Sequence, residues 1–255
     1  MKLRFKHQKF QADAAKAVVD VFAGQPYLTP SYMIDRGYEG KTMKGEEFSQ
    51  ISATEEQDFT GWSNHKIVPE LSDRLILEHL QKIQRENQIE PSPKLEGRYN
   101  LTVEMETGVG KTYTYIKTMY ELNRAYGWSK FIVVVPSIAI REGVYKTFQV
   151  TEEHFAEEYG KKIRFFIYNS AQLTEIDRFA SDSSINVMII NSQAFNARGN
   201  DARRIYMKLD EFRSRRPIDI IAKTNPILII DEPQSVEGKK TKENLKQFNP
   251  LLTLR

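Results

Sequence analysis

A glycine-containing stretch followed by lysine and threonine, residues 105–112, is the part of this sequence best suited to chemistry. It follows an apolar stretch at 99–104 and precedes a helical pattern, so it predicts a strand, a tight turn and a helix. The residues proposed to surround a bound phosphate chain are Glu106, Thr107, Gly108, Val109, Gly110, Lys111 and Thr112. Glycines let backbone N–H groups turn inward, and the helix N-terminus adds partial positive charge. Lys111 supplies a charge and Thr112 a hydroxyl for Mg²⁺, so the pattern predicts a nucleoside triphosphate site.

The strict form of this phosphate-binding pattern has glycine where Met105 stands. An ordinary strand, turn and helix is therefore the alternative interpretation of these residues. A second element at a suitable distance along the chain is needed to choose between them.

That second element is an apolar run at 226–230 that ends in two acids, Asp231 and Glu232. A continuous apolar run suits a strand buried on both faces of a parallel sheet. Acids at its carboxyl end lie where α/β proteins bind ligands. Asp231 is then suited to hold Mg²⁺, and Glu232 to orient the attacking water. A strand followed by an acidic turn is the simpler alternative.

Composition narrows the class of protein. The chain has 255 residues, 40% of them hydrophobic, which allows one large domain or two small ones. It has no cysteine, which excludes disulfides, thiol catalysis and thiolate zinc sites. The sequence shows no signal-peptide pattern and no apolar run long enough for a membrane, so we expect a cytoplasmic protein without a membrane partner. A net charge of +3 does not by itself indicate nucleic-acid binding.

The order of elements predicts an α/β fold with a mostly parallel sheet covered by helices on both faces. Periodicity predicts helices over about 10–22, from Ser72 onward, over about 139–148 and over 201–216. Strands are expected at 99–104, 130–136, 163–168, 186–190 and 226–231. Residues 25–70 carry little periodicity and are interpreted as an irregular N-terminal insertion.

Five segments resemble the restriction (Res) subunit of type III restriction-modification enzymes, which are motors of helicase superfamily 2. They are residues 105–112, 134–144, 151–155, 190–195 and 231–234. The Asp-Glu-Pro-Gln form of the last segment is unusual among such motors and points to this family, in which Met105 is also normal. The similarity covers nearly the whole chain and is weakest across 25–70.

The resemblance implies a RecA-like P-loop domain that uses ATP and Mg²⁺. It implies that residues 99–255 form the first motor domain, and that 1–98 hold an adenine-recognition helix, the insertion and a second helix. Phe10 and Gln11 would belong to the adenine motif, since a carboxamide can both donate to and accept from the adenine edge. A polar residue at a helix start is the alternative for Gln11.

The resemblance also implies a track for a DNA backbone. Ser137 and Arg141 would lie on it, because hydroxyls and guanidinium groups bind phosphates without reading sequence. Asn191 and Ser192 would extend it, with simple turn chemistry as the alternative. For Arg141 the alternative is an ion pair with Glu142 or with a neighbour on its helix.

Motors of this class have two RecA-like domains, and the second supplies arginines that contact the transferring phosphoryl group. The resemblance thus implies that this chain holds half of an ATPase site, with no second motor domain and no nuclease domain. DNA and a modification methyltransferase subunit are the implied partners. An ATPase that remodels protein without nucleic acid, or a non-catalytic module that binds DNA or the methyltransferase subunit, are the other functions to weigh.

Overall fold

A parallel β-sheet forms the centre of the computed structural model, which describes residues 5–33, 61–97, 99–196, 204–236 and 238–255. Its six strands stand in the order β3-β8-β7-β4-β6-β5, and each neighbouring pair is parallel. The strands are β3 (Asn100–Leu101), β4 (Lys130–Val135), β5 (Ile163–Ile167), β6 (Ile185–Asn191), β7 (Ile227–Ile230) and β8 (Leu252–Leu254). Every residue of β4, β6 and β7 is buried, which explains their continuous apolar sequences.

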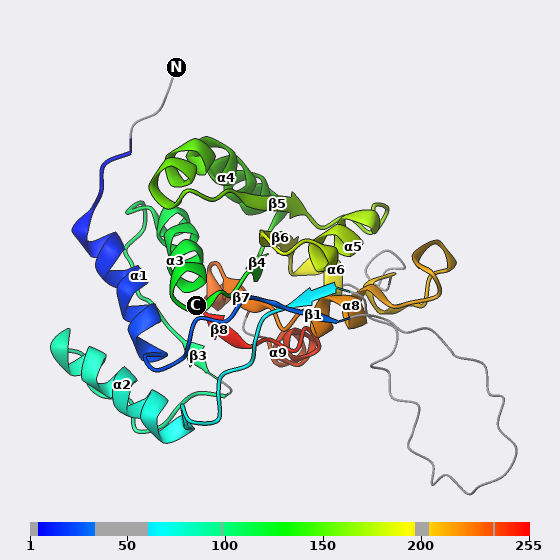
Figure 1. Ribbon diagram of the computed structural model, residues 1–255. Helices are drawn as coiled ribbons and strands as arrows, with labels where there is room; N and C mark the ends of the chain where they lie inside the picture. The colour runs from blue at the N-terminus through cyan, green and yellow to red at the C-terminus, as the bar shows by residue number, and fades with distance from the viewer. Residues whose placement is uncertain (1–4, 34–60, 98, 197–203, 237) are drawn as a thin grey trace, which may run out of the picture.

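Helices cover both faces of this sheet (Figure 1). Phe131 and Val133 of β4 pack in one core, and Ile132 and Val134 in another, because successive strand side chains point to opposite faces. The first core includes residues of α1 (Lys9–Val21), α2 (Asp73–Glu86), α3 (Lys111–Tyr126) and α4 (Ile138–Tyr159). The second includes residues of α5 (Thr174–Ser181), α6 (Gln193–Asn196), α8 (Pro217–Lys223), α9 (Lys239–Lys246) and the 3₁₀ helices η2 (Arg204–Tyr206) and η3 (Asp210–Phe212). The predicted fold class is confirmed.

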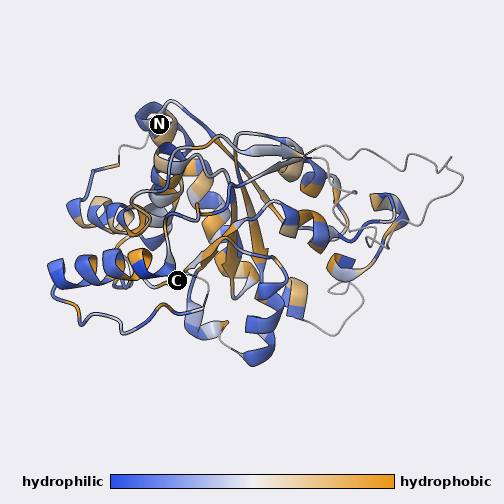
Figure 2. Cartoon of the chain, turned by 60° about the horizontal axis from the view of Figure 1, so that its bottom comes forward, coloured by the Kyte–Doolittle hydropathy of each residue, from blue (hydrophilic) through white to orange (hydrophobic). Residues whose placement is uncertain are grey.

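The strands at the centre carry the most hydrophobic residues, and the helices around them carry most of the hydrophilic ones (Figure 2). Within the described ranges, no helix combines the length and the apolar character that a membrane crossing requires.

The first helix packs into the same core as the sheet. Val18 and Val21 of α1 and Ile76 of α2 belong to the core cluster that contains Phe131 and Val133. The Ser72 side chain accepts a hydrogen bond from the Leu75 N–H at 3.4 Å, so Ser72 caps α2 as predicted. The division of the chain into 1–98 and 99–255 stays a prediction.

Both ends of the predicted irregular insertion contain ordered structure that the sequence pattern did not reveal. β1 (Ser31–Met33) pairs antiparallel with β2 (Gly61–Ser63). Next to β2, the buried Asn64 side chain accepts hydrogen bonds from the Ser129 N–H at 2.7 Å and the Lys130 N–H at 3.0 Å. This segment therefore fixes the start of β4. Residues 34–60 lie outside the described part of the chain.

Two predicted boundaries were wrong. α4 does not end near Phe148 but continues to Tyr159, because Thr151 and Phe155 extend its buried stripe until Gly160 ends the helix in the left-handed conformation. The strand expected at 99–104 is assigned only to Asn100–Leu101, although the Val103 N–H still donates to the Arg255 carbonyl at 2.8 Å.

The helix predicted over 201–216 does not form in the described residues from 204 onward. Only η2 and η3 occupy this stretch, and Arg213 and Ser214 both have φ of 56°. Left-handed residues in sequence cannot continue a right-handed helix. The helices α5, α8 and α9 were not predicted, because each spans at most eight residues and offers little periodicity.

Candidate functional site

The loop between β3 and α3 has the backbone shape of a phosphate-binding turn. Gly108 and Gly110 have φ of 81° and 89°, a region that favours glycine. A Cβ on Gly110 would lie 2.8 Å from the Gln11 carboxamide nitrogen, so a larger residue would have to displace the Gln11 side chain. Gly110 precedes α3 and no side chain caps that helix, so N–H groups of its first turn are available to an anion. Glu106, Thr107 and Lys111 are exposed, and Thr112 is half-buried.

Two acids stand at the end of β7, as the sequence predicted. The Asp231 N–H donates to the Val134 carbonyl at 2.9 Å, which fixes its backbone beside β4. Burial, and next the negative charge of Glu232, raise the pKa of the half-buried Asp231 carboxyl above its ordinary value. Glu232 is exposed and precedes the 3₁₀ helix η4 (Pro233–Ser235).

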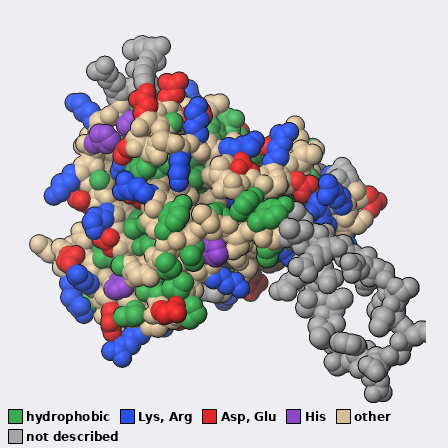
Figure 3. All heavy atoms as spheres, in the orientation of Figure 1, with side chains coloured by type: hydrophobic (Ala, Val, Ile, Leu, Met, Phe, Trp, Pro, Cys, Tyr) green, Lys and Arg blue, Asp and Glu red, His purple; other side chains and the backbone are tan. Residues whose placement is uncertain are grey.

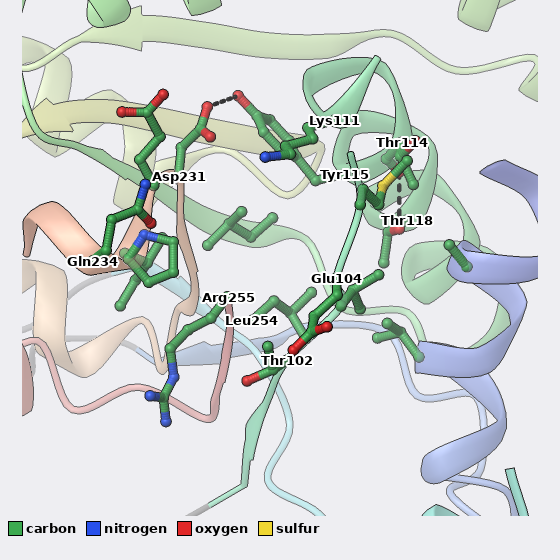
Figure 4. Close-up of a pocket in the computed structure, with 18 residues that line it drawn as sticks. Thr102, Glu104, Lys111, Thr114, Tyr115, Thr118, Asp231, Gln234, Leu254 and Arg255 are labelled. Atoms are coloured by element: carbon green, nitrogen blue, oxygen red, sulfur yellow. Dashed lines mark hydrogen bonds between the residues drawn. The ribbon is translucent and has the colours of Figure 1, made fainter. Parts of the chain in front are cut away.

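Lys111 and Asp231 line the same cavity, although 119 positions of sequence lie between them (Figure 4). Its volume is about 440 Å³, within the range of small-molecule sites. Glu232 and Gln234 also line it, as do Tyr115 of α3 and Arg255 beyond β8. A cation beside a helix N-terminus, facing two carboxylates, is a donor set that fits a nucleoside triphosphate with a divalent cation.

Gln11 lies directly against the phosphate loop. Its buried carboxamide nitrogen donates to the Val109 carbonyl at 2.9 Å, which ties α1 to the loop. Phe10 lies elsewhere: the residue is 47% exposed and lines a neighbouring cavity with residues of α1 and α2. The structure thus brings only Gln11 of this predicted pair to the loop.

The residues predicted to contact DNA lie at or beyond the carboxyl ends of two adjacent strands, because Val135 of β4 pairs with Asn191, the last residue of β6. The Ser137 hydroxyl accepts from the Ile140 N–H at 3.3 Å and caps α4. Ser192 uses its backbone in a turn, with its N–H donating to the Val135 carbonyl at 2.9 Å. The contact of these residues with DNA stays a prediction.

Arg141 makes the ion pair that the sequence offered as its alternative role. Its Nη2 lies 2.8 Å from Glu142 Oε1, and its side chain is 20% exposed. Figure 3 shows acidic and basic side chains interspersed over one face of the molecule, in keeping with the small net charge. A DNA backbone would have to compete with Glu142 for this guanidinium.

The sequence analysis missed one residue of the cavity. The Tyr115 hydroxyl donates to Asp231 Oδ2 at 3.4 Å (Figure 4). Tyr115 stands four positions after Lys111, so helical spacing could have placed the two side chains on one face of α3.

Comparison with known proteins agrees with this architecture. The family model for the type III restriction enzyme, res subunit, matches residues 43–255. The chain is 34% identical over 174 residues to the EcoP15I Res subunit of Escherichia coli, covering 61% of the chain and 18% of that protein. It is 31% identical over 228 residues to the EcoPI Res subunit of Escherichia phage P1, covering 80% of the chain and 23% of that protein.

A third relative, the StyLTI Res subunit of Salmonella typhimurium, is 34% identical over 164 residues, which cover 56% of the chain and 16% of that protein. The chain spans about a fifth of the length of these curated relatives. The family match itself covers most of the chain, including the phosphate loop and both acids. The fold, the cavity and these matches agree, and the chain belongs to the family of Res subunits of type III restriction enzymes.

Proposed function

We propose that this chain is the ATP-binding first motor domain of a DNA translocase, and that the full-length subunit couples ATP hydrolysis to movement on DNA. The observation that carries this proposal is the shared cavity of Lys111 and Asp231, at the carboxyl edge of the parallel sheet. DNA and a modification methyltransferase subunit are the proposed partners, and the cytoplasm is the proposed location.

Each residue of the site has a proposed role. The N–H groups of residues 106–112 surround the phosphates, and Lys111 binds the terminal ones. Thr112 and Asp231 would hold Mg²⁺, Asp231 directly or through water. A bound Mg²⁺ would supply positive charge against the charge that develops on the phosphate oxygens. Glu232, exposed at the cavity, orients the attacking water and holds its proton.

The proposed second motor domain supplies the arginines that complete this site. Among the residues that line the cavity the cations are Lys111 and Arg255, and Arg255 Nη2 already pairs with Glu96 Oε1 at 2.6 Å. An arginine finger contributes roughly 10³–10⁵ in rate to phosphoryl transfer. We therefore expect residues 1–255 to bind ATP and to hydrolyse it slowly.

The test is ATP binding by the Lys111→Ala protein. A hydrogen bond to a charged group contributes about 1.5–3 kcal/mol, so affinity should fall roughly ten- to hundredfold. Lys111 is exposed, so the fold should survive. Isothermal titration calorimetry with Mg²⁺ measures the affinity, and Lys161→Ala is the control, since Lys161 contacts Asn123 at the far end of α3. Equal affinity in Lys111→Ala and in the wild type would refute the assignment.

A further inference from the structure

Tyr115 joins the P-loop helix to the acid at the end of β7. Its ring packs against the first core, and its hydroxyl lines the cavity and donates to Asp231 Oδ2 at 3.4 Å (Figure 4). This oxygen-to-oxygen distance is longer than the roughly 2.5–3.0 Å that is usual for hydrogen bonds between two oxygens. The packed ring fixes where the hydroxyl can lie.

The Tyr115 phenol is a hydrogen-bond donor that carries no positive charge. Its hydroxyl contacts Asp231, one of the two side chains that are proposed to hold Mg²⁺.

We propose that Tyr115 is a positioning residue for Mg²⁺, whose hydroxyl orients the Asp231 carboxylate and acts on the metal only through it. This inference rests on the proposed nucleotide-binding function. A carboxylate has about four lone-pair positions, so one donor at Oδ2 leaves room for a metal. A lysine in this place would bring a positive charge that repels Mg²⁺, which a phenol does not.

The chemistry of other metal sites sets the expected size of the effect. Groups that orient metal ligands typically change metal affinity by roughly 10- to 100-fold when they are removed. Tyr115→Phe removes only the hydroxyl and keeps the packed ring, so the core should be preserved. Tyr113→Phe is the matched control, because the Tyr113 hydroxyl contacts His154 Nε2 at 2.8 Å and does not line the cavity.

The experiment measures ATP affinity of the wild type, Tyr115→Phe and Tyr113→Phe proteins by calorimetry, once with Mg²⁺ and once with a chelator. Tyr115→Phe should lower affinity roughly 10- to 100-fold with Mg²⁺ and leave it unchanged with chelator. Tyr113→Phe should match the wild type in both conditions. Circular dichroism checks that each variant is folded.

Two results would overturn the inference and leave the proposed function intact. The first is wild-type affinity of Tyr115→Phe with Mg²⁺. The second is an equal loss with and without Mg²⁺ in a folded protein, which would mean that the hydroxyl acts on the nucleotide. If the wild type bound ATP neither with Mg²⁺ nor with chelator, the proposed function would be overturned as well.

Discussion

Glu232 has φ of 53° and ψ of 63°, a left-handed conformation that is uncommon for a residue with a side chain. Such conformations cost on the order of 1–3 kcal/mol, and they gather at functional sites where surrounding structure enforces them. Here Asp231 is hydrogen-bonded to β4 on one side and η4 follows on the other. After this turn, Glu232 is one of the residues that line the cavity.

Glu232→Gln in the full-length subunit should keep ATP binding and lose turnover. A positioned general base contributes roughly 10²–10⁴ in rate, and an amide of the same shape cannot take the proton of water. Steady-state phosphate release measures turnover, and calorimetry measures binding. Gln234→Glu is a useful control, because it adds a carboxylate to the same cavity without replacing Glu232. Turnover near the wild-type rate would remove Glu232 from the proposed chemistry.

Local sequence was enough to single out Lys111 and Asp231, which line one cavity, since each follows a recognisable strand pattern. It could not find Tyr115, whose partner lies 116 positions away, or the bond between Gln11 and Val109, which spans 98 positions. Such contacts depend on which helix packs on which strand. Only the three-dimensional arrangement brings their atoms within hydrogen-bonding distance.

At the scale of elements, burial decided which predictions held. β4, β6 and β7 are buried throughout and their apolar runs gave their positions closely. β1 and β2 have three residues each, which is too few for the alternation of apolar and polar residues to be recognised in the sequence. The length of α4 was underestimated because its exposed polar residues obscure the buried stripe that continues through Thr151 and Phe155.

α4 also carries the proposed DNA contact. If Arg141 binds a phosphate, Arg141→Ala should weaken binding equally for all oligonucleotide sequences and reduce the slope of log affinity against log salt by roughly 0.7–0.9. Fluorescence anisotropy at several salt concentrations measures both quantities.

The ion pair with Glu142 supplies the control for this prediction. Glu142→Gln frees the guanidinium and removes a negative charge, so it should strengthen binding in the same assay. Unchanged affinity and slope in Arg141→Ala would show that the residue serves only its ion pair.

At the scale of the whole molecule, Lys130 joins the sheet to α5. Its side chain is fully buried, and Nζ donates to the Phe179 carbonyl at 2.6 Å and to the Asp182 carbonyl. Burial lowers the pKa of the Lys130 ammonium from 10.5 to about 7. The unfolded chain therefore binds more protons than the folded protein between about pH 7 and 10.5, and in that window stability should rise with pH.

Lys130→Met should reduce this rise, because methionine fills similar space and does not titrate. Thermal unfolding at pH 6.5, 7.5 and 8.5 measures the stability of both proteins. Subtracting one stability from the other removes the contribution of the titratable groups that the two proteins share. A parallel pH dependence in wild type and Lys130→Met would contradict the prediction, whichever protein is the more stable.

The strand that leads into the phosphate loop has its sheet partner near the other end of the 255 residues. Asn100 pairs with Thr253 and Leu101 with Leu254, and within the described residues β3 has no neighbour in the sheet other than β8. A ribosome therefore makes the loop long before it makes the strand that anchors it. Contacts this distant in sequence form late, because closing a long loop costs conformational entropy before the contact can stabilise the chain. We infer that the sheet from β4 to β7 can assemble first, and that nucleotide binding waits until β8 has been synthesised and has paired with β3.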